Sequence, residues 1–169
     1  MTQDRLRVER FERFLSAMGS DADPMAAGTA FVERLGQGCY LFEQSLSLLQ
    51  NLRAKGCVVG ILTNGITTVQ KSRFRYSGLS PYVAALIVSQ EEGVSKPDKR
   101  IVERALQILD CPDKEQAVIV GDSLTSDMRA ACNARVDGIW YNPKGLPRPA
   151  DNPYIKAEVR QLHDLIQYA

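Results

Sequence analysis

Three short polar segments of this sequence contain residues suited to phosphate chemistry. They are Thr63-Asn64-Gly65, Lys96-Pro97, and Gly121-Asp122-Ser123 followed by Asp127. A hydroxyl can donate to phosphate oxygens, an ammonium can offset the charge that develops on them, and carboxylates are ligands of Mg²⁺. A phosphoryl-transfer site needs these three kinds of group at one point, so the segments are candidates for a single site.

Each segment taken alone also has a simpler interpretation. The first could be only a turn, Lys96 only a solvated charge, and Asp122 or Ser123 only the cap of a helix. These simpler readings are favoured for any one segment by itself. The functional reading depends on whether the fold brings all three segments together.

The alternation of apolar runs and amphipathic stretches predicts that it does. From about residue 43 onward this alternation is typical of an α/β fold, with a parallel sheet and crossover helices on its faces. The predicted strands are 57–62, 84–88, 117–120, 138–141 and a short strand at 154–156, and the predicted helices are 43–55, 68–77, 99–109, 126–134 and 159–167. Ligands bind such sheets at the carboxyl ends of the strands, where all three polar segments follow predicted strands.

The beginning of the chain has a different pattern. Apolar residues at steps of three and four predict an amphipathic helix over 4–18, and a second helix is predicted over 25–35. We therefore expect two parts, a helical pair at 1–40 and an α/β core at 41–169.

Composition favours a cytoplasmic protein with a small-molecule ligand. The 21 basic and 20 acidic side chains leave a net charge of +1, which gives no indication of a nucleic acid polymer as partner. No apolar run approaches the ~18 residues of a membrane-spanning helix, and the charged start lacks the apolar core of a signal peptide. The four cysteines form no Cys-x-x-Cys pair and are predicted to be reduced packing residues.

The three polar segments, in this order and spacing, resemble the second, third and fourth motifs of the haloacid dehalogenase superfamily. The Thr-Asn-Gly form and the stretch 91–97 are most similar to pyrimidine 5′-nucleotidases and related small-metabolite phosphatases. The resemblance implies a Rossmann-like core over 41–169, preceded by a partial helical cap at 1–40. It favours a phosphatase over a dehalogenase, because halide-releasing members need no metal and typically lack the Gly-Asp-x-x-x-x-Asp arrangement.

The same resemblance implies how these residues would hold phosphate. Thr63 would donate a hydrogen bond to a phosphoryl oxygen, and Asn64 with the Gly65 backbone would shape the same pocket. Lys96 would neutralise the charge that develops on the phosphoryl group. The substrate implied is a small phosphorylated metabolite, with nucleoside 5′-monophosphates as an example, and its exact identity stays open.

A metal site is implied next to this pocket. Asp122 would bind Mg²⁺ directly, since a carboxylate is a hard ligand for a hard cation. Asp127 would not bind the metal directly but would position Lys96 or a metal-bound water, and Ser123 would assist.

The first motif of the superfamily is not found in the sequence. It is a strand ending in Asp-x-Asp-Gly-Thr, whose first aspartate attacks phosphorus. The only Asp-x-Asp, at 21–23, has no apolar strand before it and is followed by Pro24. In the family the first strand lies between the strands that end here at Leu62 and Val120. We therefore expect an N-terminally truncated relative that is inactive alone and has a gap in its sheet.

Several alternatives stay open at this stage. The missing motif could reflect a start-codon error or truncated record, a fragment, or a short protein that fills the gap by self-association. The leading function is a Mg²⁺-dependent phosphatase when the missing segment is present. The rival is a catalytically inactive phosphate- and metal-binding or interaction protein. A receiver-type domain is disfavoured because its acidic pair comes first in the sequence, whereas here the acidic pair comes last.

Overall fold

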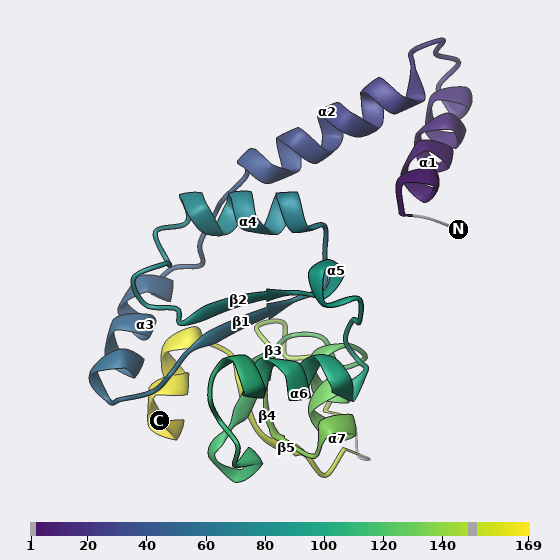
Figure 1. Cartoon of the computed structure of the whole chain (residues 1–169). Helices are drawn as coiled ribbons and strands as arrows, with labels where there is room; N and C mark the ends of the chain where they lie inside the picture. The colour runs from purple at the N-terminus through teal and green to yellow at the C-terminus, as the bar shows by residue number, and fades with distance from the viewer. Residues whose placement is uncertain (1–2, 149–151) are drawn as a thin grey trace.

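The computed structural model describes residues 3–148 and 152–169, and it shows parallel strands flanked by helices (Figure 1). The helices are α1 (Gln3–Ala17), α2 (Pro24–Gln37), α3 (Ser45–Ala54), α4 (Thr67–Tyr76), α5 (Ser89–Glu92), α6 (Lys99–Ile108) and α7 (Asp127–Ala134), with 3-10 helices η1 (Lys114–Gln116) and η2 (Leu162–Tyr168). The strands are β1 (Gly60–Thr63), β2 (Ala85–Val88), β3 (Val118–Gly121), β4 (Asp137–Tyr141) and β5 (Ile155–Val159). The predicted α/β class is confirmed.

The strands form two parallel sheets. One has the order β1-β2 and the other the order β3-β4-β5. Thr63 lies opposite Val88 in the first sheet, and Gly121 lies opposite Trp140 in the second. Within the described residues, no backbone ladder joins β1 to β3. The two strands that end in the first and third polar segments are therefore not paired with each other.

One hydrophobic core nevertheless connects the two sheets on the side of α6 and α7. Its buried members are Ile87, Ile101, Val102, Ala105, Ala130, Ala134 and Val136. Leu62 from β1 and Ile119 from β3 both pack against this cluster. Helix α6 can bridge the sheets because its apolar residues fall on one face, and Asp98 caps its first turn by accepting from the Arg100 N–H.

The opposite side of the second sheet is covered only in part. Helices α3 and η2 pack over β4 and β5 in a cluster of Leu48, Ile139, Ala157, Val159 and Leu165. This cover does not extend over β3, where Val118 is 47% exposed and Val120 is 42% exposed. Successive strand residues face opposite sides of a sheet, so Ile119 between them points to the α6 and α7 side instead.

Helices α1 and α2 form a pair that extends away from the strands in Figure 1. They pack through aromatic rings, with the Phe11 and Phe31 ring centroids 5.5 Å apart. Helix α2 rests on α4, where the Ser72 hydroxyl donates to the Gly36 carbonyl over 2.9 Å. The Asp23 side chain caps α2 by accepting from the Met25 and Ala26 N–H groups, which is the ordinary role of an aspartate before a helix.

Several predicted boundaries were wrong, most of all at the C-terminus. The sequence predicts a helix over 159–167, but Val159 ends strand β5 and a 3-10 helix follows at 162–168. The strand is longer than the predicted 154–156. Its residues alternate in burial, with Ala157 and Val159 in the cluster covered by α3 and Ile155 packed with Met128 of α7. Helix α5 was not predicted. Within the described residues no helix is both long and apolar enough to span a lipid bilayer.

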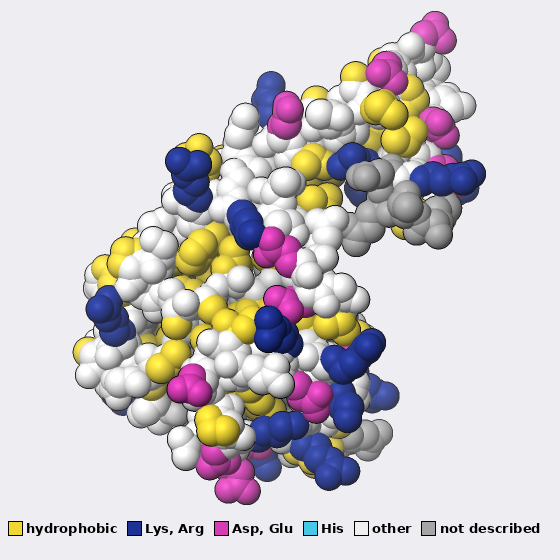
Figure 2. Space-filling model, in the orientation of Figure 1, with side chains coloured by type: hydrophobic (Ala, Val, Ile, Leu, Met, Phe, Trp, Pro, Cys, Tyr) yellow, Lys and Arg dark blue, Asp and Glu magenta, His cyan; other side chains and the backbone are white. Residues whose placement is uncertain are grey.

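Charged side chains of both signs are scattered over the face shown in Figure 2. Hydrophobic side chains lie at the surface among them, on the helical pair and on the core. The exposed aromatic residues include Tyr40, at 95%, and Phe42, at 67%. Both belong to the segment that connects α2 to α3.

Candidate active site

Lys96 bridges strand β1 of the first sheet and the start of helix α7, which packs on the second sheet. Its Nζ donates to the Leu62 carbonyl of β1 over 2.7 Å and to Asp127 Oδ1 at the start of α7 over 2.6 Å. The Lys96 side chain is only 12% exposed. An ammonium has three N–H donors, so one remains for a ligand. The structure thus holds a fixed positive charge at the carboxyl end of β1.

The position of Asp127 depends on the glycine that ends β3. A Cβ added at Gly121 would lie 2.4 Å from Asp127 Cγ, closer than real carbon atoms approach. The second carboxylate oxygen, Oδ2, accepts from the Ser123 N–H over 3.1 Å. Both oxygens of Asp127 are therefore engaged, one by Lys96 and one by the turn before α7. This arrangement suits a residue that positions Lys96.

The Thr63-Asn64-Gly65 segment follows β1 and meets the loop that carries Lys96. The Asn64 amide makes two 2.9 Å hydrogen bonds, both with the main chain of Lys96. The Gly65 N–H donates to the Ser89 hydroxyl over 3.2 Å. Among the described residues, the Thr63 hydroxyl contacts only the Asn64 carbonyl, over a long 3.5 Å, so it is the group of this segment best able to turn to a ligand.

Asp122 presents an exposed side chain after β3, and its main chain is held by the core. Its carbonyl accepts from Trp140 Nε1 over 3.0 Å, and Trp140 is 1% exposed among Met128 and Ile155. Within the described part of the chain, no hydrogen-bond donor or cation contacts the Asp122 carboxylate. It remains available to a cation.

The fit of these residues to Mg²⁺ is partial. Within residues 3–148 and 152–169, no group of three or more His, Cys, Asp or Glu side chains is placed to hold a metal ion. Asp127 is engaged by Lys96, which leaves Asp122 as the one free carboxylate of the pair. Mg²⁺ is commonly bound through one or two carboxylates together with water and substrate phosphate. The described residues supply one part of such a site.

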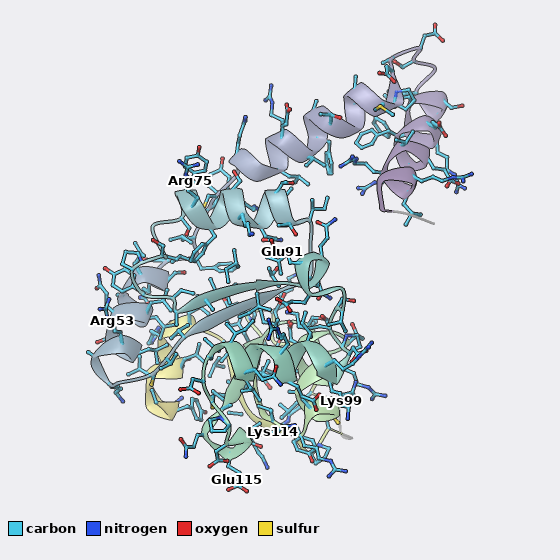
Figure 3. The ribbon with its side chains drawn as sticks, in the orientation of Figure 1. Arg53, Arg75, Glu91, Lys99, Lys114 and Glu115 are labelled. Carbon is cyan, nitrogen blue, oxygen red and sulfur yellow. The ribbon has the colours of Figure 1, made fainter. Side chains whose placement is uncertain are left out.

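Two ion pairs at the surface connect the short helix α5 to helices α4 and α6. Glu91, labelled in Figure 3, lies on α5 and pairs with Lys71 of α4. Glu92 on the same short helix pairs with Arg104 of α6 over 3.0 Å. The side chains of Lys71 and Glu91 are 57% and 38% exposed, so this pair is far more open to water than the pair of Lys96 with Asp127.

Sequence reasoning missed two residues that support the site. Ser89 directly follows β2 and is 9% exposed, so the rule that found the other polar segments at strand ends could have found it. Trp140 carries no such signal, because an aromatic residue within an apolar run indicates a buried strand and nothing more. Its indole donor needs a partner when buried, and only the fold shows that the partner is Asp122.

Comparison with known proteins finds similarity over most of the chain. Residues 7–135 match the model of the haloacid dehalogenase-like hydrolase family. The chain is 31% identical over 167 residues to pyrimidine 5′-nucleotidase YjjG of Escherichia coli, covering 99% of this chain and 72% of that protein. It is 34% identical over 146 residues to pyrimidine 5′-nucleotidase PynA of Streptococcus pneumoniae, covering 86% of this chain and 62% of that protein.

A solved structure is similar throughout the chain. The crystal structure of the putative HAD-hydrolase YfnB from Bacillus subtilis, bound to magnesium, has a TM-score of 0.86 and 30% identity, covering 99% of this chain and 73% of that one. The chain thus spans between 62% and 73% of the length of these three relatives. The predicted similarity to the nucleotidase branch is confirmed, and the chain belongs to the haloacid dehalogenase-like hydrolase family.

Proposed function

We propose that this chain is the phosphate-binding part of a Mg²⁺-dependent phosphatase that acts on a small phosphorylated metabolite. The observation that carries this proposal is the Lys96 ammonium, fixed by Asp127 and the Leu62 carbonyl with one N–H left over. Nucleoside 5′-monophosphates are the first candidate substrates, because two of the relatives are named pyrimidine 5′-nucleotidases.

Each residue has a role in this proposal. The Thr63 hydroxyl donates to a non-bridging phosphoryl oxygen, and the Lys96 ammonium stabilises the charge that grows on the transferring group. Asp127 holds Lys96 in place. Asp122 supplies one carboxylate to Mg²⁺, which when bound would neutralise phosphate charge, and Ser123 holds the turn between the two aspartates.

The nucleophile in this proposal is an aspartate from a segment outside these 169 residues. Its carboxylate attacks phosphorus, the bond to the leaving alcohol breaks, and water then hydrolyses the resulting aspartyl-phosphate to release inorganic phosphate. Such a segment would form a strand between β1 and β3. The residues at 1–40 would then be part of a helical cap, and those at 41–169 the core.

The test compares this chain with a longer one that carries an N-terminal strand ending in Asp-x-Asp-Gly-Thr. Hydrolysis of para-nitrophenyl phosphate and of nucleoside monophosphates is measured with and without Mg²⁺. We expect turnover only from the longer chain and only with Mg²⁺. Robust turnover by the shorter chain that Asp21→Asn abolishes would instead place the nucleophile at 21–23 and overturn this assignment.

A second candidate function is a non-catalytic protein that binds phosphate or another chain. The observation that favours it is the unpaired edge of β3, with the exposed Val118 and Val120 beside it. Unpaired strand edges are templates for pairing with another chain, including a second copy. Sedimentation velocity distinguishes the candidates, because a stable dimer whose formation is abolished by Val120→Lys supports self-association, and a monomer at all concentrations opposes it.

A further inference from the structure

The Asn64 side chain makes an unusual pair of contacts with one distant residue. Its Oδ1 accepts from the Lys96 N–H, and its Nδ2 donates to the Lys96 carbonyl, each over 2.9 Å. The two residues are 32 positions apart. A carboxamide that satisfies both the donor and the acceptor of one residue fixes the position and the orientation of that main chain. We name this pair of hydrogen bonds the Asn64 clamp.

The clamp completes the restraint of Lys96. Its ammonium is held by Asp127 and the Leu62 carbonyl, and its main chain is held by Asn64. A lysine side chain is long and flexible, so its ammonium would sample several positions if only the ammonium or only the main chain were held. Because the ammonium and the main chain are both held, the third N–H of the ammonium points in one direction. Because Asn64 directly follows Thr63, the end of β1 sets both the hydroxyl and the lysine.

We propose that Asn64 is a positioning residue for Lys96 and that its side chain is not a phosphate ligand. Both polar groups of the amide are occupied within the protein, so a phosphoryl group meets Thr63 and Lys96. The effect of the clamp on phosphate binding rests on the proposed function. The clamp itself does not, and the two can be tested apart.

The experiment measures how fast acetic anhydride acetylates each lysine of the 169-residue chain, with mass spectrometry of peptides. Lys96, at 12% exposure, is expected to react more slowly than Lys99, which is 60% exposed. Asn64→Ala removes both clamp bonds and is expected to raise the Lys96 rate about tenfold. The rates of Lys71 and Lys99 should stay unchanged. An unchanged Lys96 rate would overturn the proposal.

A matched control is Ser89→Ala. It removes the acceptor of the Gly65 N–H, one residue from Asn64, without touching Lys96. We expect it to leave the Lys96 rate near that of the wild type. An equal rise in both variants would mean that general loosening of the loop exposes the lysine, and the clamp would be rejected.

Asn64→Asp guards against loss of the fold. It keeps the shape and the acceptor for the Lys96 N–H, but it places a second acceptor against the Lys96 carbonyl. A selective rise in Lys96 acetylation supports the clamp, and no rise contradicts it. If Asn64→Ala raises the rates of all lysines together, its fold is lost and Asn64→Asp decides.

Inorganic phosphate separates this inference from the proposed function. If phosphate binds at Thr63 and Lys96, it should slow Lys96 acetylation in the wild type and less so in Asn64→Ala. Protection without any effect of Asn64→Ala on Lys96 would reject the clamp and keep the phosphate site. A raised Lys96 rate in Asn64→Ala without protection by phosphate would keep the clamp and reject the phosphate site.

Discussion

The two sheets are tied together on one side and left apart on the other. On the side of α6 and α7, Leu62 from one sheet and Ile119 from the other pack against a shared core in which Ile101 is fully buried. On the opposite side, Val118 and Val120 of β3 remain 47% and 42% exposed. Along the short strand β3, Ile119 therefore packs against a buried core, whereas its neighbours Val118 and Val120 lie on an exposed apolar surface.

The difference shows where the site obtains its rigidity. Lys96 joins the Leu62 carbonyl of β1 to Asp127 of α7, and we call these two contacts the buried tie. The group that links the two halves of the core is therefore also the positive charge of the site. Among the residues that the structure describes, the packed side fixes these groups with no backbone pairing between β1 and β3.

The largest effect is expected from Asp127→Ala. It leaves the Lys96 ammonium mostly buried without its partner, and breaking a buried pair in this way costs about 3–5 kcal/mol of unfolding free energy. Urea denaturation followed by the fluorescence of Trp140, the only tryptophan, measures the change. A loss below about 1 kcal/mol, the level of a surface pair, would contradict the buried tie.

Two controls sharpen this result. Glu91→Ala breaks the exposed pair with Lys71 and should cost less than about 1 kcal/mol. The double variant Lys96→Met with Asp127→Leu removes both charges and should recover most of the stability lost in Asp127→Ala. If the double variant is as unstable as the single one, packing around Asp127 rather than unpaired charge is responsible.

The apolar core that joins the two sheets is tested by comparing Ile101→Ala with Val118→Ala. Ile101 is 0% exposed, and its truncation should cost about 2–5 kcal/mol through lost burial and a cavity. Val118 is half exposed, so its truncation should change stability by no more than about 0.5 kcal/mol. Equal losses in the two variants would show that the open side of β3 is covered in solution.

Gly121→Ala should have a smaller effect that reaches the site directly. The new Cβ would overlap Asp127, whose carboxylate must then move away from Lys96. Overpacking of this kind costs about 1–3 kcal/mol. Stability is measured as for Asp127→Ala, and acetylation of Lys96 should become faster. Gly60→Ala serves as a control for overpacking alone, since its new Cβ would lie 2.7 Å from Leu109 Cδ1 and not against Asp127.

Sequence patterns were sufficient for the parts of this fold that depend on local periodicity. The apolar run 57–62 and the amphipathic stretch 99–109 predicted β1 and α6, and the rule of strand ends pointed to Thr63, Lys96 and Asp122. At the C-terminus the strand at 154–156 was predicted, but its extension to Val159 and the 3-10 helix over 162–168 were not, because the boundary between two short elements is poorly marked by pattern alone.

The contacts that define the site could not be predicted in the same way. The hydrogen bonds between Asn64 and Lys96 join a side chain to a main chain 32 positions away, so they depend on the conformation of two loops. The close approach of Gly121 to Asp127 also exists only after α7 packs on β3. In both cases the residue types were visible in the sequence, and their partners were not.

The smallest expected effect concerns the cap of α6, the helix that bridges the two sheets. Hydrogen bonds from the Arg100 side chain and then from the Arg100 N–H lower the pKa of Asp98 from 3.8 to about 2. A carboxyl group with a lowered pKa stabilises the folded state above its unfolded pKa, and this contribution disappears as the pH falls toward the folded pKa.

Asp98→Asn retains an acceptor for the helix but does not titrate. The unfolding free energy of the wild type should therefore exceed that of Asp98→Asn at about pH 5, and the excess should shrink between about pH 4 and pH 2. Both proteins are compared by urea denaturation at each pH. An excess that stays constant over this window would mean that Asp98 stabilises α6 through the shape of its side chain and not through its charge.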